Sequence, residues 1–288
     1  MSIKLESVSY TYMPGTPYEQ TAISDISLEI EKGEFLAIIG HTGSGKSTLV
    51  QHLNGLLHPT SGRVLVDGVD LAGKSPEAKR VRHSVGMVFQ YPEHQLFAET
   101  IYEDIAFGPR NLKLDEAEVR QRVESAMEFV GLDYKNFAER SPFQLSGGQM
   151  RRVAIAGVIA MHPDYLVLDE PSAGLDPAAR NAIFAEIVKL HRTRGTTVIL
   201  VTHNMEEAAR LADRMLVLAK GKVQLEGRPK EVFKADRALL HAAGVDVPRM
   251  VDLVDTLRRH GVAIPDDTIS VDGLVREILA GQGRGASC

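Results

Sequence analysis

The sequence contains little cysteine and no long apolar run. Its one cysteine, Cys288, cannot form a disulfide within the chain, so a disulfide-stapled fold is excluded and a reducing compartment is expected. No apolar stretch is long enough to cross a bilayer, and residues 1–6 do not resemble a signal peptide. We therefore expect any role at a membrane to depend on a partner protein.

An excess of positive charge is also missing. Lysine and arginine number 33 against 38 aspartate and glutamate residues, so no global basic field draws the chain to nucleic acid. Internal repeats and low-complexity tracts are absent from the sequence. With 288 residues, 44% of them hydrophobic, the composition is that of an ordinary globular protein with a sizeable core.

A glycine-rich loop separates an apolar run at 34–39, which predicts a buried strand, from helical spacing at 49–57. The loop reads Gly40, His41, Thr42, Gly43, Ser44, Gly45, Lys46, Ser47, Thr48. Strand, glycine loop and helix together predict a phosphate-binding P-loop, in which backbone N–H groups and a helix N-terminus face the phosphate. We expect Lys46 to reach the β- and γ-phosphates and the Ser47 hydroxyl to hold Mg²⁺.

Polar residues follow three further buried strands, predicted at 85–89, 165–168 and 197–201. These residues are Gln90, Asp169, Glu170 and His203. Because ligands of open α/β sheets bind at the carboxyl ends of the strands, we expect this group to face the P-loop. Asp169 is expected to hold Mg²⁺ through water and Glu170 to accept a proton from an attacking water, while His203 could donate to the γ-phosphate.

A second glycine segment precedes an apolar helix, without an accompanying lysine. It reads Leu145, Ser146, Gly147, Gly148, Gln149. A serine and two glycines at a helix start predict half of a phosphate site, although an ordinary helix cap remains the alternative. Asp115 is expected to cap a helix of the insertion that ends at Gly131. Asp176 is expected to cap the helix that begins at Pro177 and ends at Gly195.

The chain is expected to be β-rich over 3–39 and helical over an insertion at about 91–162. A nucleotide-binding domain is predicted over 1–235, and a helical extension over 236–288, with a helix at 270–280, is expected to serve as a dimerisation element. One of Tyr10, Tyr12 and Tyr18 could stack on an adenine base, and their spacing does not separate Tyr12 from Tyr10.

The segment 91–97 suits a docking surface, unless Leu96 and Phe97 pack inside the insertion.

In this order, the motifs resemble those of the ATP-binding-cassette (ABC) ATPases over residues 3 to about 235. The most specific of them is the pentapeptide at 145–149, the signature of that family. The resemblance implies an α/β P-loop fold with a mixed sheet core, an N-terminal antiparallel β-subdomain, a helical insertion and a small helical extension. It also aligns the adenine-stacking residue with Tyr12, places Gln90 on Mg²⁺, and makes Glu170 the catalytic base and His203 the γ-phosphate switch. Ser172, Ala173, Gly174, Leu175 and Asp176 correspond to the D-loop of the family.

A narrower resemblance is to the energy-coupling factor (ECF) transporter ATPases, carried by residues 90–97, 104–109, 141–144 and 150–158. The Ala173-Gly174-Leu175 step is similar to the second of the two paralogous ATPases of that group. This resemblance implies an ATP-hydrolysing peripheral subunit on the cytoplasmic face of the cell membrane, which powers vitamin or transition-metal-ion uptake. It would pair head to tail with a paralogous ATPase or with an identical copy, each signature serving the nucleotide of the other subunit. A transmembrane coupling protein and a substrate-binding membrane protein would complete the complex.

Two other functions share some of these motifs. A soluble ABC ATPase that acts on nucleic acid or ribosomes typically carries two cassettes, a coiled-coil insert or basic segments, none of which occurs here. A nucleotide-gated binding module without catalysis is disfavoured because Glu170 and His203 are both present. The sequence therefore favours a transport ATPase without a nucleic-acid partner.

Overall fold

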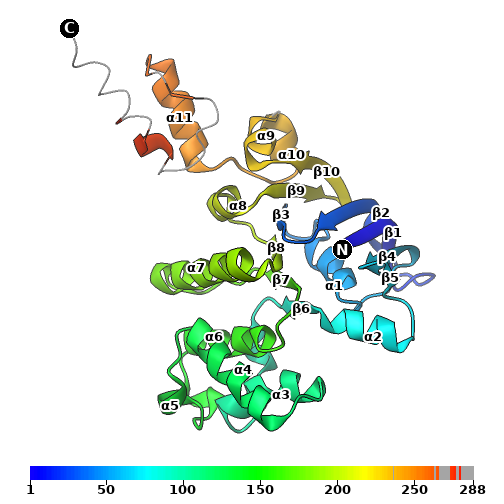
Figure 1. Cartoon of the computed structure of the whole chain (residues 1–288). Coiled ribbons are helices and arrows are strands. Elements are labelled where there is room, and N and C mark those ends of the chain that lie inside the picture. Colours follow the sequence, from blue (N-terminus) through cyan, green and yellow to red (C-terminus); the bar gives the residue numbers. More distant parts are fainter. Residues whose placement is uncertain (236, 263, 266–272, 277–278, 280–288) are drawn as a thin grey trace.

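The computed structural model describes residues 1–235, 237–262, 264–265, 273–276 and 279. Cys288 and most of the helix expected at 270–280 lie outside these described residues. Two β-sheets lie side by side, with a helical lobe beyond one end of the larger sheet (Figure 1). The predicted α/β class, with an antiparallel β-subdomain, a mixed core sheet and a helical insertion, is confirmed.

The larger sheet has six strands in the order β10-β9-β3-β8-β7-β6. Its strands are β3 (Phe35–Ile39), β6 (Val85–Val88), β7 (Tyr165–Asp169), β8 (Thr197–Val201), β9 (Arg214–Ala219) and β10 (Lys222–Gly227). All neighbours run parallel except β10, which pairs antiparallel with β9. The parallel strands are apolar runs because helices cover both faces. Their carboxyl ends therefore share one edge.

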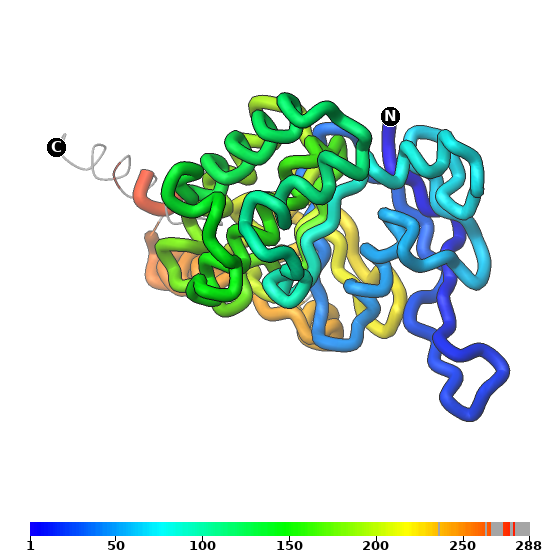
Figure 2. The backbone as a smooth tube through the Cα atoms, turned by 90° about the horizontal axis from the view of Figure 1, so that it is seen from below, coloured from blue at the N-terminus to red at the C-terminus, as the bar shows by residue number. Residues whose placement is uncertain are grey.

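The smaller sheet consists of antiparallel strands in the order β2-β1-β4-β5. Its strands are β1 (Ser2–Tyr12), β2 (Gln20–Glu31), β4 (Ser61–Val66) and β5 (Val69–Asp70). Along β2, Ile26, Leu28 and Ile30 are buried, as their alternation predicts. They share a hydrophobic cluster with α1 (Lys46–Leu53), which lies between the two sheets. The loop that joins β1 to β2 projects from this part of the molecule (Figure 2).

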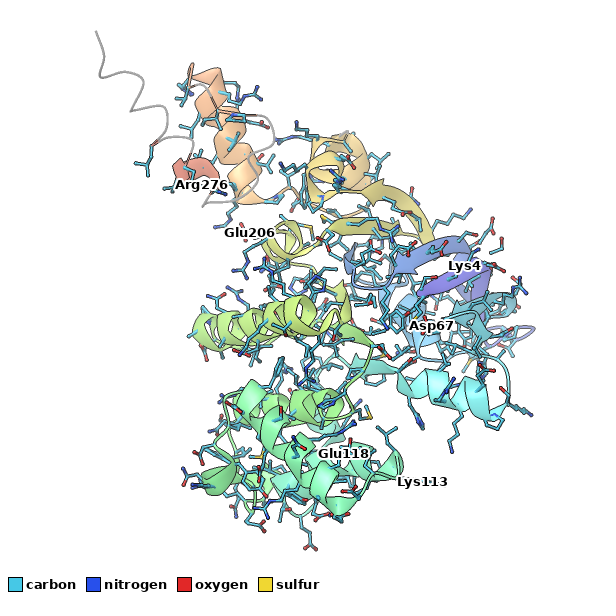
Figure 3. All side chains as sticks on the ribbon, in the orientation of Figure 1. Lys4, Asp67, Lys113, Glu118, Glu206 and Arg276 are labelled. Carbon is cyan, nitrogen blue, oxygen red and sulfur yellow. The ribbon has the colours of Figure 1, made fainter. Side chains whose placement is uncertain are left out.

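The helical lobe is the insertion between β6 and β7. A separate helix, α2 (Pro76–His83), precedes β6 in the chain. The lobe contains η1 (Pro92–Gln95), α3 (Ile101–Asn111), α4 (Glu116–Phe129), α5 (Tyr134–Phe137), η2 (Pro142–Gln144) and α6 (Gly147–Ile159). The Asp115 carboxylate accepts a hydrogen bond from Glu118 N at 2.9 Å and so caps α4, as predicted. Charged side chains line the outside of this lobe, among them Lys113 (Figure 3).

The remaining helices cover the larger sheet and continue into the C-terminal region. They are α7 (Pro177–Arg194), α8 (Met205–Leu211), α9 (Pro229–Lys234), α10 (Arg237–Ala242) and α11 (Arg249–Arg259). The Asp176 carboxylate accepts from Ala178 N and Ala179 N, and α7 is followed by the left-handed Gly195, so both expected ends are confirmed. The helix expected at 49–57 instead begins at Lys46 and ends at Leu53. It starts earlier because the glycine loop turns directly into the helix.

Candidate functional site

A cavity of about 430 Å³ lies at the carboxyl edge of the larger sheet. It is bordered by the P-loop from Thr42 to Thr48, and by Tyr12, Gln90, Asp169 and Glu170. The structure thus brings together side chains that the sequence separates by more than one hundred positions. The cavity is also bordered by residues 20–22 of β2 and by Lys220 and Gly221, which the sequence motifs did not indicate.

The P-loop depends on glycine where the chain passes close to β9. Gly40 has φ 151°, and a Cβ at this position would lie 2.1 Å from the Leu218 carbonyl oxygen. The Lys46 ammonium group donates to the carbonyl oxygens of Gly40 at 2.7 Å and His41 at 2.8 Å. Burial lowers the pKa of Lys46, while Glu170 and Asp169 act to raise it. The ammonium group is therefore held against the loop, beside two carboxylates.

Oxygen-bearing side chains suited to Mg²⁺ lie together in this cavity. Asp169 is buried at the end of β7 and borders the same cavity as Ser47. Burial raises the pKa of the Asp169 carboxyl, the nearby Ser47 hydroxyl opposes this rise, and Glu170 adds to it. A hydroxyl, a carboxylate and the Gln90 amide fit Mg²⁺, which takes few protein ligands and completes its shell with water and phosphate oxygens.

Glu170 and His203 face each other across the ends of β7 and β8. His203 Nδ1 lies 3.0 Å from Glu170 Oε2, and the register pairs Asp169 with Val201, which aligns the two strand ends. Glu170 has φ 51°, a left-handed conformation that is uncommon for a residue with a side chain and is concentrated at functional sites. A carboxylate and an imidazole in contact can hold and orient a proton at this edge.

Glu207, in α8, is a buried carboxylate that the sequence motifs did not single out. It accepts from the Ser172 hydroxyl at 3.3 Å and from the Thr202 hydroxyl at 3.1 Å, and lies 3.7 Å from Arg180 Nε. Burial raises the pKa of the Glu207 carboxyl, against the Thr202 hydrogen bond and the Arg180 charge. Since Ser172 follows Glu170 and Thr202 precedes His203, Glu207 ties together the loops that carry both.

The segment 145–149 lies apart from this cavity within the single chain. Ser146 caps α6: its hydroxyl accepts from Gln149 N at 3.3 Å, while Gln149 Oε1 accepts from Ser146 N at 3.0 Å. A Cβ at Gly147 would meet nothing within 4 Å, and one at Gly148 would lie 3.6 Å from a Leu175 methyl group. The signature and the Ser172–Asp176 segment are therefore neighbours, and the start of α6 is open to an incoming ligand.

Of the three N-terminal tyrosines, Tyr12 is the one that borders the cavity. Its hydroxyl lies 3.2 Å from Thr48 Oγ1. Tyr10 packs behind it, with edge-to-face contacts to Tyr12 and to the buried His52. Tyr18 is 79% exposed in the β1–β2 loop. Side-chain direction thus distinguishes Tyr12 from Tyr10, which spacing alone did not.

The sequence left open whether segment 91–97 forms a docking surface or packs inside the insertion. Its residues differ in this respect. Leu96 packs inside the helical lobe, whereas Phe97 is 61% exposed and forms an edge-to-face pair with the exposed Phe107 at 5.0 Å. Glu93 of the same segment makes a buried two-pronged ion pair with Arg151 of α6, at 2.9 and 3.0 Å. The segment that leads to Phe97 is thereby connected to α6.

Comparisons with known proteins agree with this geometry. The model of the ABC transporter family matches residues 23–173. The chain is 51% identical over 279 residues to the energy-coupling factor transporter ATP-binding protein EcfA2 of Clostridium tetani, covering 97% of this chain and 96% of that protein. It is 55% identical over 285 residues to the protein of the same name in Symbiobacterium thermophilum, covering 98% of each.

Comparison with solved structures also finds similarity to ATP-binding cassettes of ABC transporters. The structure of cbiO1 from Clostridium perfringens, described as part of the ABC transporter complex cbiONQ, matches with a TM-score of 0.71 and 39% identity, covering 88% of this chain and 98% of that one. The dimeric post-hydrolysis structure of the cassette MJ0796, bound to ADP and Pi, matches with a TM-score of 0.71 and 32% identity, covering 79% and 98%. Within the described residues, the helices are too short or too polar to pass through a bilayer.

Proposed function

This chain belongs to the ABC transporter family as the ATP-hydrolysing subunit of an ECF-type importer, and we propose that its own nucleotide binds in the 430 Å³ cavity beside the P-loop. Backbone N–H groups of the P-loop and Lys46 hold the phosphates, and Tyr12 stacks on the adenine base. Ser47, Gln90 and, through water, Asp169 hold Mg²⁺, which neutralises charge that develops on the phosphates.

The observation that carries this assignment is the 3.0 Å contact of His203 with Glu170, which borders the P-loop cavity. Glu170 accepts the proton of the attacking water, and His203 donates to the γ-phosphate. The remaining loop residues, Gly40 to Thr48, position the phosphates for this reaction. Because Glu170 and His203 lie in contact, they favour an ATP-hydrolysing protein over a nucleotide-gated binding module without catalysis.

A Glu170→Gln substitution tests this assignment because it keeps the shape of the side chain and removes its basicity. We expect ATP affinity within about twofold of wild type and a 10²- to 10⁴-fold loss of turnover, the usual contribution of a general base. Phosphate release by the assembled transporter and equilibrium ATP binding are the two measurements. Wild-type turnover in this variant would remove Glu170 from the mechanism.

The position of the signature supports a head-to-tail pair of ATPases. Ser146, Gly147 and Gly148 offer backbone donors at the start of α6, away from the chain's own P-loop, so they serve the nucleotide held by the partner. Leu145, Gln149 and the D-loop residues 172–176 lie at the same surface. A paralogous ATPase is the partner that we propose, rather than a second copy, on the second-paralogue character of the D-loop.

The exposed Phe97–Phe107 pair supports docking to a membrane protein. Exposed aromatic pairs are characteristic of protein interfaces, and this one is connected to the signature helix through Glu93 and Arg151. The protein is then peripheral at the cytoplasmic face of the cell membrane, bound to a transmembrane coupling protein. A substrate-binding membrane protein in the same complex selects a vitamin or a transition-metal ion.

Co-purification from membranes tests the docking site. We expect wild-type protein to retain membrane proteins, and Phe97→Ala to lose them, because the substitution removes the more exposed ring of the aromatic pair. Tyr18→Ala is the matched control, since Tyr18 is also an exposed aromatic residue but lies on the β1–β2 loop. Equal retention by both variants would place the docking surface elsewhere, and retention of ribosomes or DNA in its place would contradict the transport function.

A further inference from the structure

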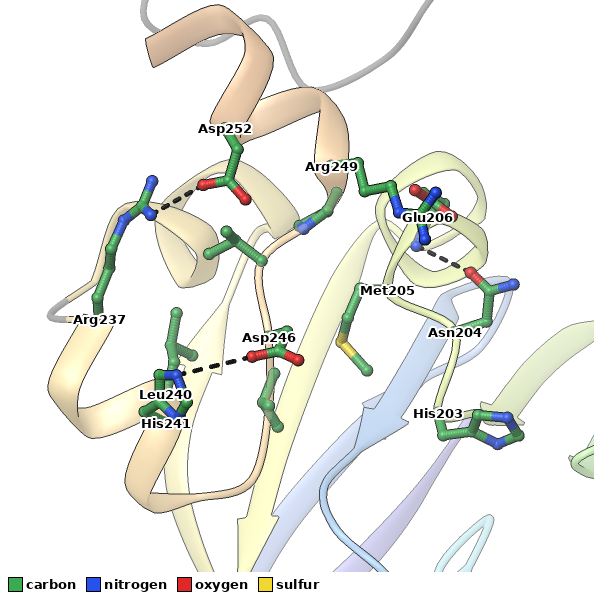
Figure 4. A pocket seen from close by; sticks show the side chains of 13 residues that line it. His203, Asn204, Met205, Glu206, Arg237, Leu240, His241, Asp246, Arg249 and Asp252 are labelled. Carbon is green, nitrogen blue, oxygen red and sulfur yellow. Dashed lines mark hydrogen bonds and ion pairs between the residues drawn. The ribbon is translucent and has the colours of Figure 1, made fainter. Parts of the chain in front are cut away.

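A second cavity, of about 560 Å³, lies between the loop that carries His203 and the C-terminal helices (Figure 4). One side is formed by His203, Asn204 and Met205, at the start of α8. The other side is formed by residues between Arg237 of α10 and Asp252 of α11. The C-terminal extension therefore faces the catalytic loops of its own chain.

The end of α10 and the turn after it belong to the same hydrophobic cluster as the strand that leads into the P-loop. Leu240, Ala243 and Val245 are buried, and they belong to one hydrophobic cluster with Ala37 and Ile39 of β3. Ile39 is the residue immediately before the P-loop glycine, so this part of the extension supports the point at which the P-loop begins. Burial of these side chains fixes the turn in place.

Gly244, between the two buried residues of this turn, touches the P-loop itself. It has φ +66°, and a Cβ at this position would lie 2.7 Å from His41 Cβ and 3.4 Å from His41 Cγ. Rotation of the His41 side chain cannot relieve such a contact, because its Cβ is attached to the backbone of the P-loop. Any larger residue at 244 must move either the packed turn or the loop.

Movement of His41 has a direct consequence for the lysine of the site. The His41 carbonyl oxygen accepts from Lys46 Nζ at 2.8 Å and from Ser44 N at 3.1 Å. Displacement of His41 therefore changes both the path of the loop and the position of the ammonium group. A displacement of the extension therefore reaches Lys46 and the phosphate site through the contacts of His41.

We propose that Gly244 is a positioning residue of the P-loop, and that the C-terminal extension sets the ATP affinity of the chain through its contact with His41. The proposal rests on the function proposed above, in which the P-loop holds the phosphates. Gly244 does not touch the nucleotide and acts through His41. An event that shifts the extension, such as binding of a partner subunit, then changes the ATP affinity of the P-loop.

The test compares Gly244→Ala with Gly195→Ala in the full chain. Gly195 has the same φ of +66°, so both substitutions carry the same backbone strain, but a Cβ at 195 would meet nothing within 4 Å. With a fluorescent ribose-labelled ATP as the probe, we expect Gly244→Ala to weaken binding about tenfold, the scale of a short contact in a packed site, and Gly195→Ala to change it less than twofold.

A second pair of variants isolates the contact. In a His41→Gly background, the methyl group that Gly244→Ala adds has no Cβ to meet, so we expect the same ATP affinity with and without that substitution. Melting curves accompany every measurement, and this pair decides the outcome if Gly244→Ala alone does not fold. Equal weakening by Gly244→Ala and Gly195→Ala, or an undiminished effect without the His41 side chain, overturns the proposal. Failure of the wild-type chain to bind ATP would instead contradict the proposed function.

Discussion

Single residues at the edge of the larger sheet hold the reactive groups in place. Glu207 is buried in α8, and its carboxylate receives two hydroxyl hydrogen bonds, one from the loop after β7 and one from the residue before His203. A buried carboxylate with several donors is a rigid anchor, because loss of any partner leaves an unpaired polar group. The distance between Glu170 and His203 therefore depends on a residue that touches neither of them.

Substitution of Glu207 by alanine leaves the Ser172 and Thr202 hydroxyls without their acceptor. We expect turnover to fall about 10- to 100-fold, since small misplacements of reacting groups have effects of this size, while ATP affinity changes less than about twofold. Steady-state kinetics and ATP binding measure the two quantities. Glu206→Ala, at the exposed neighbour in the same helix turn (Figure 3), is the control. Glu207→Gln should restore part of the turnover. Equal losses of affinity and turnover would indicate a structural role only.

At the scale of elements, α6 connects two surfaces of the molecule. Its first turn carries the signature residues, and Arg151 in the next turn pairs with Glu93 beside the exposed aromatic surface. A helix transmits displacement along its axis because its hydrogen-bonded backbone is stiff. We therefore expect a displacement of the segment that carries Glu93 to reach the start of the same helix.

Gly147→Ala tests the signature end of α6. A Cβ at this position is free of contacts in the single chain, and alanine favours a helix over glycine by about 0.5–1 kcal/mol, so we expect unchanged or slightly higher stability. In the assembled pair, the methyl group would meet the nucleotide held by the partner, and we expect ATPase activity to fall at least about tenfold. Gly157→Ala, farther along the same helix, is the control. Full activity of Gly147→Ala would argue against a composite site.

At the scale of the whole molecule, the cavity beside the P-loop lies where three parts meet. The β-subdomain contributes Tyr12, the core sheet contributes Asp169 and Glu170, and the lysine comes from α1 between them. The C-terminal turn supports the same loop from outside through Gly244. A ligand that binds to this junction stabilises the folded chain to an extent set by its concentration relative to its dissociation constant.

ATP should therefore raise the melting temperature of the chain. At one hundred times the dissociation constant, linkage predicts about 2.7 kcal/mol, which corresponds to a rise of about 4–5 °C for a protein of this size. Lys46→Ala should abolish the rise at the same ATP concentration, whereas Lys189→Ala, at an exposed position of α7, should not. The measurement is a thermal melt at several ATP concentrations. An unchanged rise in Lys46→Ala would contradict the role of the P-loop lysine.

The sequence by itself determined the local features: the P-loop, the buried strands, the capped starts of α4 and α7, and the polar residues at the strand ends. These depend on residue spacing and on backbone preferences that neighbouring positions encode. Only the tertiary structure decided that Tyr12 and not Tyr10 borders the cavity, that Phe97 is exposed while Leu96 is buried, and that Gly244 contacts the P-loop. Such outcomes depend on side-chain direction and on packing between distant segments, which no local pattern specifies.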